Sequence, residues 1–171
     1  MARADQWRRR LVAALAEQQL WLKTYPVVDP QGSLLNEEAM VRIGTGDDTL
    51  MAGEFLPWVH RLELDGELDR AVLMLGLEQA ASSGAPVCIN LTVASLEDEN
   101  FLPWLSGQLS THSDDARLLS ANIAEAMAFS HPQGFRRLHD ALRRHGARLG
   151  IARMGYRVSD IGRSARWVRT T

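Results

Sequence analysis

Residues 65–93, DGELDRAVLMLGLEQAASSGAPVCINLTV, join an amphipathic helix to an apolar strand and thereby decide the fold class. In residues 65–84, Asp65 is a candidate N-cap and Gly84 a candidate stop signal. One face of this helix is expected to carry Leu68, Val72, Leu75 and Gln79. The run 86–93 is mostly apolar and of strand length, which is typical of a buried strand. The stretch therefore predicts a parallel sheet that is covered by helices.

The rest of the chain continues this alternation of strands and helices. Strand patterns lie at residues 21–28 and 34–43, joined by the turn DPQG, and at 117–123 and 147–155. Helical patterns lie at residues 1–22, 99–110 and 131–146. Their apolar faces include Leu11, Leu15, Gln18 and Leu22 in the first and Phe135, Leu138 and Leu142 in the last. About five strands of parallel type are expected, which indicates an α/β barrel or a doubly wound sheet with its functional groups at the carboxyl ends of the strands.

Composition bounds the class of protein. At 171 residues, with 46% hydrophobic and 23% charged residues, the chain suits one soluble globular domain. A formal net charge of -2 gives no reason to expect nucleic acid as a partner. The single cysteine, Cys88, excludes an internal disulfide framework and is expected to be a buried thiol. The five histidines have no metal-ligand spacing.

The basic and apolar residues near the amino terminus superficially resemble a signal peptide. Glu17 ends the apolar run too early for one, and no run is long enough to span a membrane. The sequence therefore predicts a cytoplasmic domain, attached to a membrane only through segments outside this chain.

Residues 34–44, LLNEEAMVRIG, place three different functional groups on one face of a strand. Side chains alternate with period two, so Glu38, Met40 and Arg42 point to one side. The opposite, packed face is expected to carry Ala39, Val41 and Ile43. A carboxylate, a soft apolar group and a guanidinium in line are suited to a cation, a ring and a phosphate.

Further polar groups lie at the ends of the later strands, at Asn90, residues 122–125 (NIAE) and residues 152–155 (ARMG). In this order and spacing the sequence resembles the EAL domain, a barrel family that hydrolyses the bacterial second messenger cyclic di-GMP. The resemblance extends from Leu11 to Gly162, and EAMVR is similar to the family's E-x-L-x-R segment. It implies a TIM-type (β/α) barrel and a single EAL-like domain over residues 1–171. Such a barrel needs eight strands and roughly 250 residues, so the domain is expected to be truncated on its C-terminal side.

The resemblance also implies that most metal ligands of active members are altered. Glu38 and Asn90 match family ligands, whereas Asn122 stands where a carboxylate is expected. The family segment D-D-F-G becomes Ala152, Arg153, Met154 and Gly155, so both aspartates are lost. Hydrolysis by two hard cations needs several anionic oxygens. A guanidinium about 4 Å from a cation costs roughly 4 kcal/mol near a protein surface. We therefore expect a catalytically inactive domain with no cofactor and no metal.

The same resemblance implies a set of ligand-binding residues. Arg42 and Asp69 correspond to family residues that contact cyclic di-GMP, and Met40 to a position that packs on guanine. Tyr25 replaces a common glutamine, which puts that contact in doubt. Arg153 would favour a phosphate. With its lost aspartates and retained D-I-G-R, the C-terminal segment most resembles the degenerate EAL domains of LapD-type receptors.

Simpler structural roles remain open for the same residues. Glu38 and Arg153 suit solvated surface charges, Asn90 suits a loop cap, and Asp69 suits a charge favourable to the first turn of a helix. We expect a cyclic di-GMP receptor first. A protein-interaction module that has lost nucleotide binding ranks second, and an active phosphodiesterase ranks third. Unpaired strand edges of an incomplete barrel also predict homo-oligomer formation.

Overall fold

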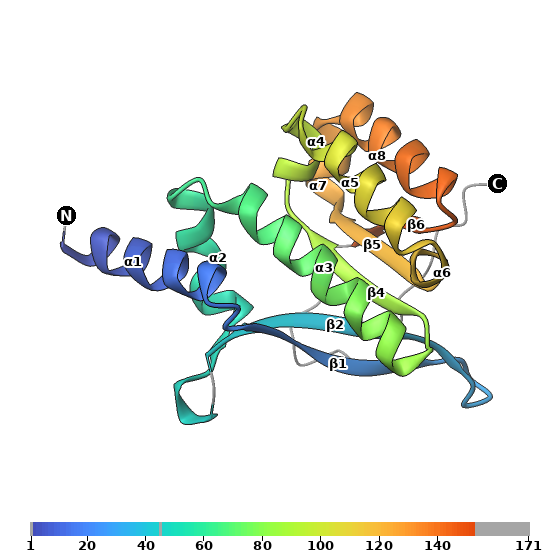
Figure 1. Ribbon diagram of the computed structural model, residues 1–171, viewed down its shortest axis with the longest axis horizontal. Coiled ribbons are helices and arrows are strands. Elements are labelled where there is room, and N and C mark those ends of the chain that lie inside the picture. Colours follow the sequence, from blue (N-terminus) through green and yellow to red (C-terminus); the bar gives the residue numbers. More distant parts are fainter. Residues whose placement is uncertain (1, 45, 153–171) are drawn as a thin grey trace.

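A computed structural model describes residues 2–44 and 46–152. Its centre is one open sheet with the strand order β1-β2-β4-β5-β6, with β3 added beside β2 (Figure 1). The strands are β1 (Leu20–Val28), β2 (Leu34–Ile43), β3 (Leu50–Met51), β4 (Val87–Leu91), β5 (Leu119–Ala124) and β6 (Arg148–Ala152). The helices are α1 (Ala2–Ala16), α2 (Ala52–Arg61), α3 (Asp65–Ser83), α4 (Ala94–Glu97), α5 (Phe101–Thr111), α6 (Ser113–Ala116), α7 (Glu125–Ser130) and α8 (Pro132–Arg144), with the 3-10 turn η1 (Gly46–Asp48).

Strand pairing confirms the expected α/β class and its parallel sheet. Strands β2, β4, β5 and β6 pair in parallel in that order. The expectation that the first strand is also of parallel type is wrong, because β1 pairs with β2 as an antiparallel hairpin. The turn between them is too short for the crossover that a parallel pair requires. Asp29 organises this turn by accepting hydrogen bonds from the backbone N–H groups of Gln31 and Ser33 through its Oδ1.

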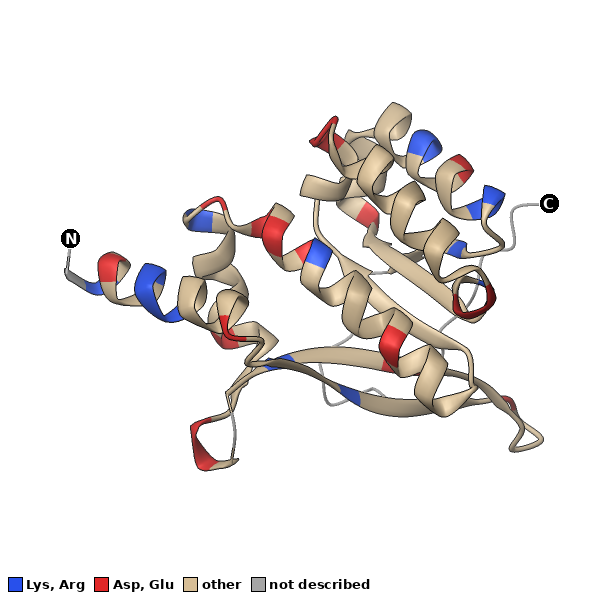
Figure 2. Cartoon of the chain, in the orientation of Figure 1, with Lys and Arg blue, Asp and Glu red and all other residues tan. Residues whose placement is uncertain are grey.

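The α3–β4 unit forms the centre of the apolar core. Leu68 and Val72 are buried as expected, but Leu75 and Gln79 are only half-buried, and the packed face of α3 runs through Leu73 and Leu77. Gly76 sets this rotation of the helix, because a Cβ there would lie 2.7 Å from Ile89 Cγ2 and 3.1 Å from Leu119 Cδ1. The helix therefore packs closely on the sheet along the face that contains glycine. Charged residues lie mostly on helices and loops (Figure 2).

The helix ends differ in part from the sequence expectations. Gly84 ends α3 with a left-handed φ of 64°, as expected, but Asp65 is the first helical residue and makes no capping hydrogen bond. Helix α1 ends at Ala16, and Leu22 lies in β1, so Gln18 and Leu22 do not extend its face. In α8, Leu138 and Leu142 are buried and Phe135 is half-buried. No helix in residues 2–44 and 46–152 is long and apolar enough to cross a bilayer.

Arg70 ties α3 to the segment that precedes and begins α5. Its Nη2 lies 2.6 Å from Asp98 Oδ2, and its Nη1 donates to the Gly66 carbonyl at 3.0 Å. The guanidinium also lies over the rings of Phe101, at 5.6 Å, and Trp104, at 5.5 Å. The hydrogen bond from Arg70 is the main reason why the pKa of Asp98 is lowered.

Replacing Arg70 by methionine is expected to lower the free energy of unfolding by about 2 kcal/mol, because a charge-assisted hydrogen bond and two cation–π contacts are lost together. Chemical denaturation of Arg70→Met measures this. Arg137→Met is the matched control, since Arg137 is exposed on α8. An equal, small change in both variants would show that the Arg70 contacts contribute nothing beyond surface charge.

Candidate functional site

The candidate site lies on the face of the sheet opposite α3. Ile89 points at Gly76 of α3, so its neighbours Cys88 and Asn90 point to the other face. Cys88 lies beside Glu38 of β2 in the parallel register, and Asn90 Nδ2 lies 3.9 Å from Met40 Sδ. The structure thus brings the polar face of β2 and the end of β4 together, as the sequence predicts.

Glu38 is half-buried at the centre of this face. Burial disfavours the charged form of this carboxyl group and therefore raises its pKa. Cys88 beside it is buried, and burial raises the pKa of its thiol to about 11, with a further increase from the charge of Glu38. The expectation of a buried thiol is confirmed. Tyr25 of β1 pairs with Glu38 in the hairpin and borders the same face.

Met40 and Arg42 continue along the strand. Both are half-buried, and Ala39 and Ile43 on the opposite face are fully buried, as predicted. Val41 departs from the predicted alternation, because it is half-buried like Met40 and Arg42. Arg42 Nη1 donates to the Val41 carbonyl at 3.0 Å, and no carboxylate in the described part of the chain pairs with this guanidinium. Its remaining N–H groups are available to an anion.

Asn122 extends the site onto β5. It pairs in register with Asn90 on one side and with Gly150 of β6 on the other, so two amides stand side by side on the site face. Glu125 begins α7 directly after β5. Arg153, for which a phosphate contact is expected, lies outside the described residues, as do Met154 and Gly155.

Asp69 occupies a different place from the other candidates. It lies on α3 with 1% of its surface exposed. Its Oδ1 accepts a hydrogen bond from the Thr92 backbone N–H at 2.9 Å, and its Oδ2 accepts one from Thr92 Oγ1 at 2.9 Å. Burial is the largest influence on this carboxyl and raises its pKa to about 7. Asp69 therefore holds the loop after β4 and presents no free surface for direct contact with a ligand.

Thr92 is the site-supporting residue that sequence reasoning missed. Its Oγ1 accepts from the Ala94 backbone N–H at 3.2 Å, and its carbonyl accepts from Ser95 Oγ at 2.8 Å. These bonds fix the turn from β4 into α4, two residues after Asn90. The signal was present as threonine and serine in TVAS directly after an apolar strand, a pattern typical of hydroxyl-stabilised turns.

The donor groups that residues 2–44 and 46–152 place on this face do not fit two divalent cations. Within residues 2–44 and 46–152, no three His, Cys, Asp or Glu side chains are grouped so that they could hold a metal ion. The site face offers the Glu38 carboxylate and the amides of Asn90 and Asn122. Hard cations of this kind take six or more oxygen ligands, several of them anionic.

Comparison with known proteins matches residues 8–167 to the EAL domain family. A comparison with curated protein sequences gives no match. Among solved structures, the chain is similar to Vibrio cholerae LapD (S helix-GGDEF-EAL) bound to c-di-GMP, with 21% identity, a TM-score of 0.81, and coverage of 93% of this chain and 40% of LapD. The apo form of the same protein gives 22% identity, a TM-score of 0.79, and coverage of 86% and 37%.

A third similar structure is the FimX EAL domain from Pseudomonas aeruginosa bound to c-di-GMP. It shares 24% identity with a TM-score of 0.78, over 90% of this chain and 64% of that domain. The chain thus spans less than two thirds of each of these structures, which agrees with an incomplete (β/α) barrel. With nearly all of its length matched by the family, this protein belongs to the EAL domain family.

Proposed function

We propose that this chain binds cyclic di-GMP and does not hydrolyse it. The observation that carries the proposal is the site face itself, on which Arg42, Met40 and Glu38 follow one strand and Asn90 adjoins Met40 at 3.9 Å. A guanidinium without a carboxylate partner suits a phosphodiester oxygen, and a thioether suits the face of a guanine ring. Both LapD and FimX, which have similar folds, have structures with c-di-GMP bound.

The absence of turnover follows from the ligand set. One half-buried carboxylate with a raised pKa and two amides supply too little negative charge to hold two cations and activate a water molecule. Ala152 in place of an aspartate removes one more oxygen donor from the end of β6. As a receptor for a cytoplasmic messenger, the domain would act in the cytoplasm, alone or as part of a membrane receptor.

Within this proposal the candidate residues divide into two roles. Glu38, Met40, Arg42 and Asn90 contact the ligand, and Arg153 remains a candidate phosphate contact. Asp69 positions the loop after Asn90 through Thr92, at 2.9 Å from both its backbone N–H and its hydroxyl. This assignment replaces the direct contact expected from the family resemblance.

Replacing Arg42 by alanine is expected to weaken cyclic di-GMP binding at least thirtyfold, which corresponds to the roughly 2 kcal/mol of a hydrogen bond to a charged group. Calorimetric titration in EDTA measures the affinity, and product analysis after adding magnesium or manganese measures turnover. Arg137→Ala on the outer side of α8 is the matched control and should bind as the unmodified chain does.

Each outcome of that titration separates the hypotheses. Binding without linear product supports a receptor, whereas formation of linear product would contradict it and identify an active phosphodiesterase. Unchanged affinity in Arg42→Ala would refute the role of this residue.

A second function, a protein-interaction module, gains support from apolar side chains at the surface. Phe129 of α7 is 72% exposed, and Met127 on the same helix is 38% exposed. Large exposed aromatic groups are typical of interaction sites. If titration with cyclic di-GMP gives no heat, this function takes precedence. Association of two copies through the edges β1 and β6 is a further proposal, which light scattering would test.

A further inference from the structure

A pocket of about 370 Å³ lies at the amino-terminal edge of the sheet, at the end opposite the candidate nucleotide site. It forms where α6 leads into β5 and where α8 leads into β6. Its lining residues are Ser113, Arg117, Arg144, His145 and Gly146. None of these residues belongs to the face that carries Glu38 and Asn90, so the pocket is separate from the site described above.

Gly146 shapes this pocket and places Arg117 in it. Gly146 has a φ of +79°, which favours glycine, and its N–H bonds to the Arg143 carbonyl at 3.0 Å to close α8. A Cβ on Gly146 would lie 3.0 Å from Arg117 Cγ. The aliphatic stem of Arg117 therefore packs against the glycine backbone, which brings its guanidinium to the end of α8 where Arg144 lies.

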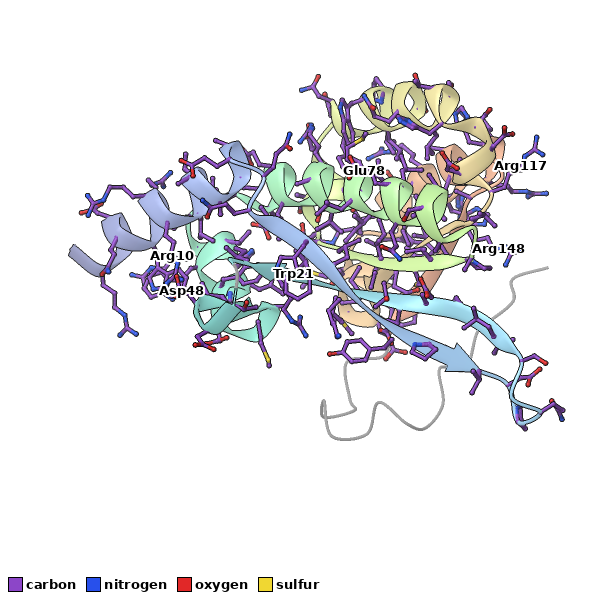
Figure 3. All side chains as sticks on the ribbon, turned by 60° about the horizontal axis from the view of Figure 1, so that its bottom comes forward. Arg10, Trp21, Asp48, Glu78, Arg117 and Arg148 are labelled. Atoms are coloured by element: carbon purple, nitrogen blue, oxygen red, sulfur yellow. The ribbon has the colours of Figure 1, made fainter. Side chains whose placement is uncertain are left out.

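The charge in the pocket is positive and unbalanced. Two arginines of the described chain have carboxylate partners, Arg10 with Asp48 at 2.9 Å and Arg70 with Asp98 at 2.6 Å. In residues 2–44 and 46–152, neither Arg117 nor Arg144 forms an ion pair or a side-chain hydrogen bond, and no carboxylate lines the pocket. Figure 3 shows Arg117 and Arg148 at one end of the molecule, far from the Arg10–Asp48 pair.

Two unpaired guanidiniums around one hollow repel each other and are stabilised by an anion between them. The planar guanidinium of arginine matches the oxygens of a phosphate group. Hydrogen bonds between these two charged groups are about twice as strong as hydrogen bonds between neutral groups. The Ser113 hydroxyl and the His145 ring add two further hydrogen-bonding groups at the rim. A volume of about 370 Å³ has room for a small phosphate compound.

We propose that the pocket of Ser113, Arg117, Arg144 and His145 is a second anion site, which binds a small phosphate-bearing ligand independently of the cyclic di-GMP site. Arg117 and Arg144 hold the phosphate oxygens, and Gly146 keeps Arg117 in place. The proposal does not depend on the function of the opposite edge of the sheet.

The test is calorimetric titration of the full chain with pyrophosphate in low-salt buffer. The double variant Arg117→Gln, Arg144→Gln is expected to bind pyrophosphate at least tenfold more weakly than the unmodified chain. The matched control is Arg136→Gln, Arg137→Gln, which removes the same charge from exposed positions of α8 and should leave the affinity unchanged. The thermal midpoints of both double variants should be close to that of the unmodified chain, since all four arginines are exposed.

The same variants test whether the pocket and the cyclic di-GMP site are independent. Arg42→Ala should keep its pyrophosphate affinity, and the Arg117/Arg144 double variant should keep its cyclic di-GMP affinity. If the double variant loses cyclic di-GMP binding as well, the pocket is not independent of the nucleotide site and the proposal fails. No pyrophosphate binding by the unmodified chain, or an equal loss in the control variant, would also overturn it.

Discussion

Replacing Asp69 by asparagine is expected to make the protein progressively more stable than the unmodified chain as the pH rises from 4 to 8. Asp69 is 1% exposed, and burial raises its pKa from 3.8 to about 7. Between these two values the folded state holds a proton on Asp69 that the unfolded state has released. Stability from this group is therefore fully present below about pH 3.8 and is lost as the pH rises to about 7.

The expected size of this effect is large for a single group. One pKa unit corresponds to about 1.4 kcal/mol, so the difference between 3.8 and about 7 corresponds to roughly 4 kcal/mol of stability lost across this range. Asparagine has no charge to bury and keeps one oxygen that can accept the hydrogen bond from the Thr92 N–H. The difference in stability between the two proteins should therefore grow with pH and level off above pH 7.

Urea denaturation of both proteins at several pH values measures this difference. Asp98→Asn is an informative control, because a hydrogen bond from Arg70 lowers the pKa of Asp98 from 3.8. The stability from that carboxylate is lost only below this pH, so the difference between Asp98→Asn and the unmodified chain should stay nearly constant from pH 4 to 8. A difference between Asp69→Asn and the unmodified chain that stays constant from pH 4 to 8 would show that Asp69 is ionised throughout. In that case the hydrogen bonds from Thr92 would compensate fully for its burial.

Replacing Gly134 by alanine is expected to lower the free energy of unfolding by about 3 kcal/mol, at the upper end of the range for overpacking. Gly134 lies in the first turn of α8, and a Cβ there would lie 2.5 Å from the Leu96 carbonyl oxygen of α4 and 3.2 Å from its carbonyl carbon. These are backbone atoms of a buried residue, so no rotamer change relieves the contact. Helix α8 would have to move away from α4.

Gly107→Ala provides the control for this prediction. Gly107 lies in α5, and a Cβ there would meet nothing within 4 Å. The same substitution should therefore stabilise the protein by about 0.5–1 kcal/mol, as alanine does in an exposed helix. Thermal and chemical denaturation of both variants measure the contrast. Equal small effects at the two positions would contradict the close approach of α8 to α4.

Local sequence patterns were sufficient for most elements of the fold. The alternation in residues 34–43 correctly placed Ala39 and Ile43 on the packed face of β2, because period two is a property of the extended backbone itself. The apolar run at residues 86–93 was correctly identified as a buried strand, and Gly84 as the end of the preceding helix. The direction of β1 was predicted incorrectly, since strand pattern carries no information about direction unless the connecting turn is also considered.

The candidate site was predictable only in part. Glu38, Met40 and Arg42 were proposed as site residues from their spacing, and Asn90 from its place at the end of a strand, because side chains at the carboxyl ends of parallel strands converge. The structure brings Asn90 next to Met40, on the face that also carries Glu38. Asp69 was placed with them by family resemblance, yet its carboxylate accepts hydrogen bonds from Thr92. Helical position alone does not tell whether a carboxylate faces a ligand or a loop.

The sequence by itself determined the α/β class and the packed positions of Ala39 and Ile43 in β2, because these depend on residue identity and on local periodicity. Only the tertiary structure decided three other features: the environment of Asp69, the close approach of α8 to α4 at Gly134, and the pocket around Arg117 and Arg144. Each of these joins residues from different elements. Burial, pKa and close packing depend on such long-range contacts, which the order of residues along one segment does not reveal.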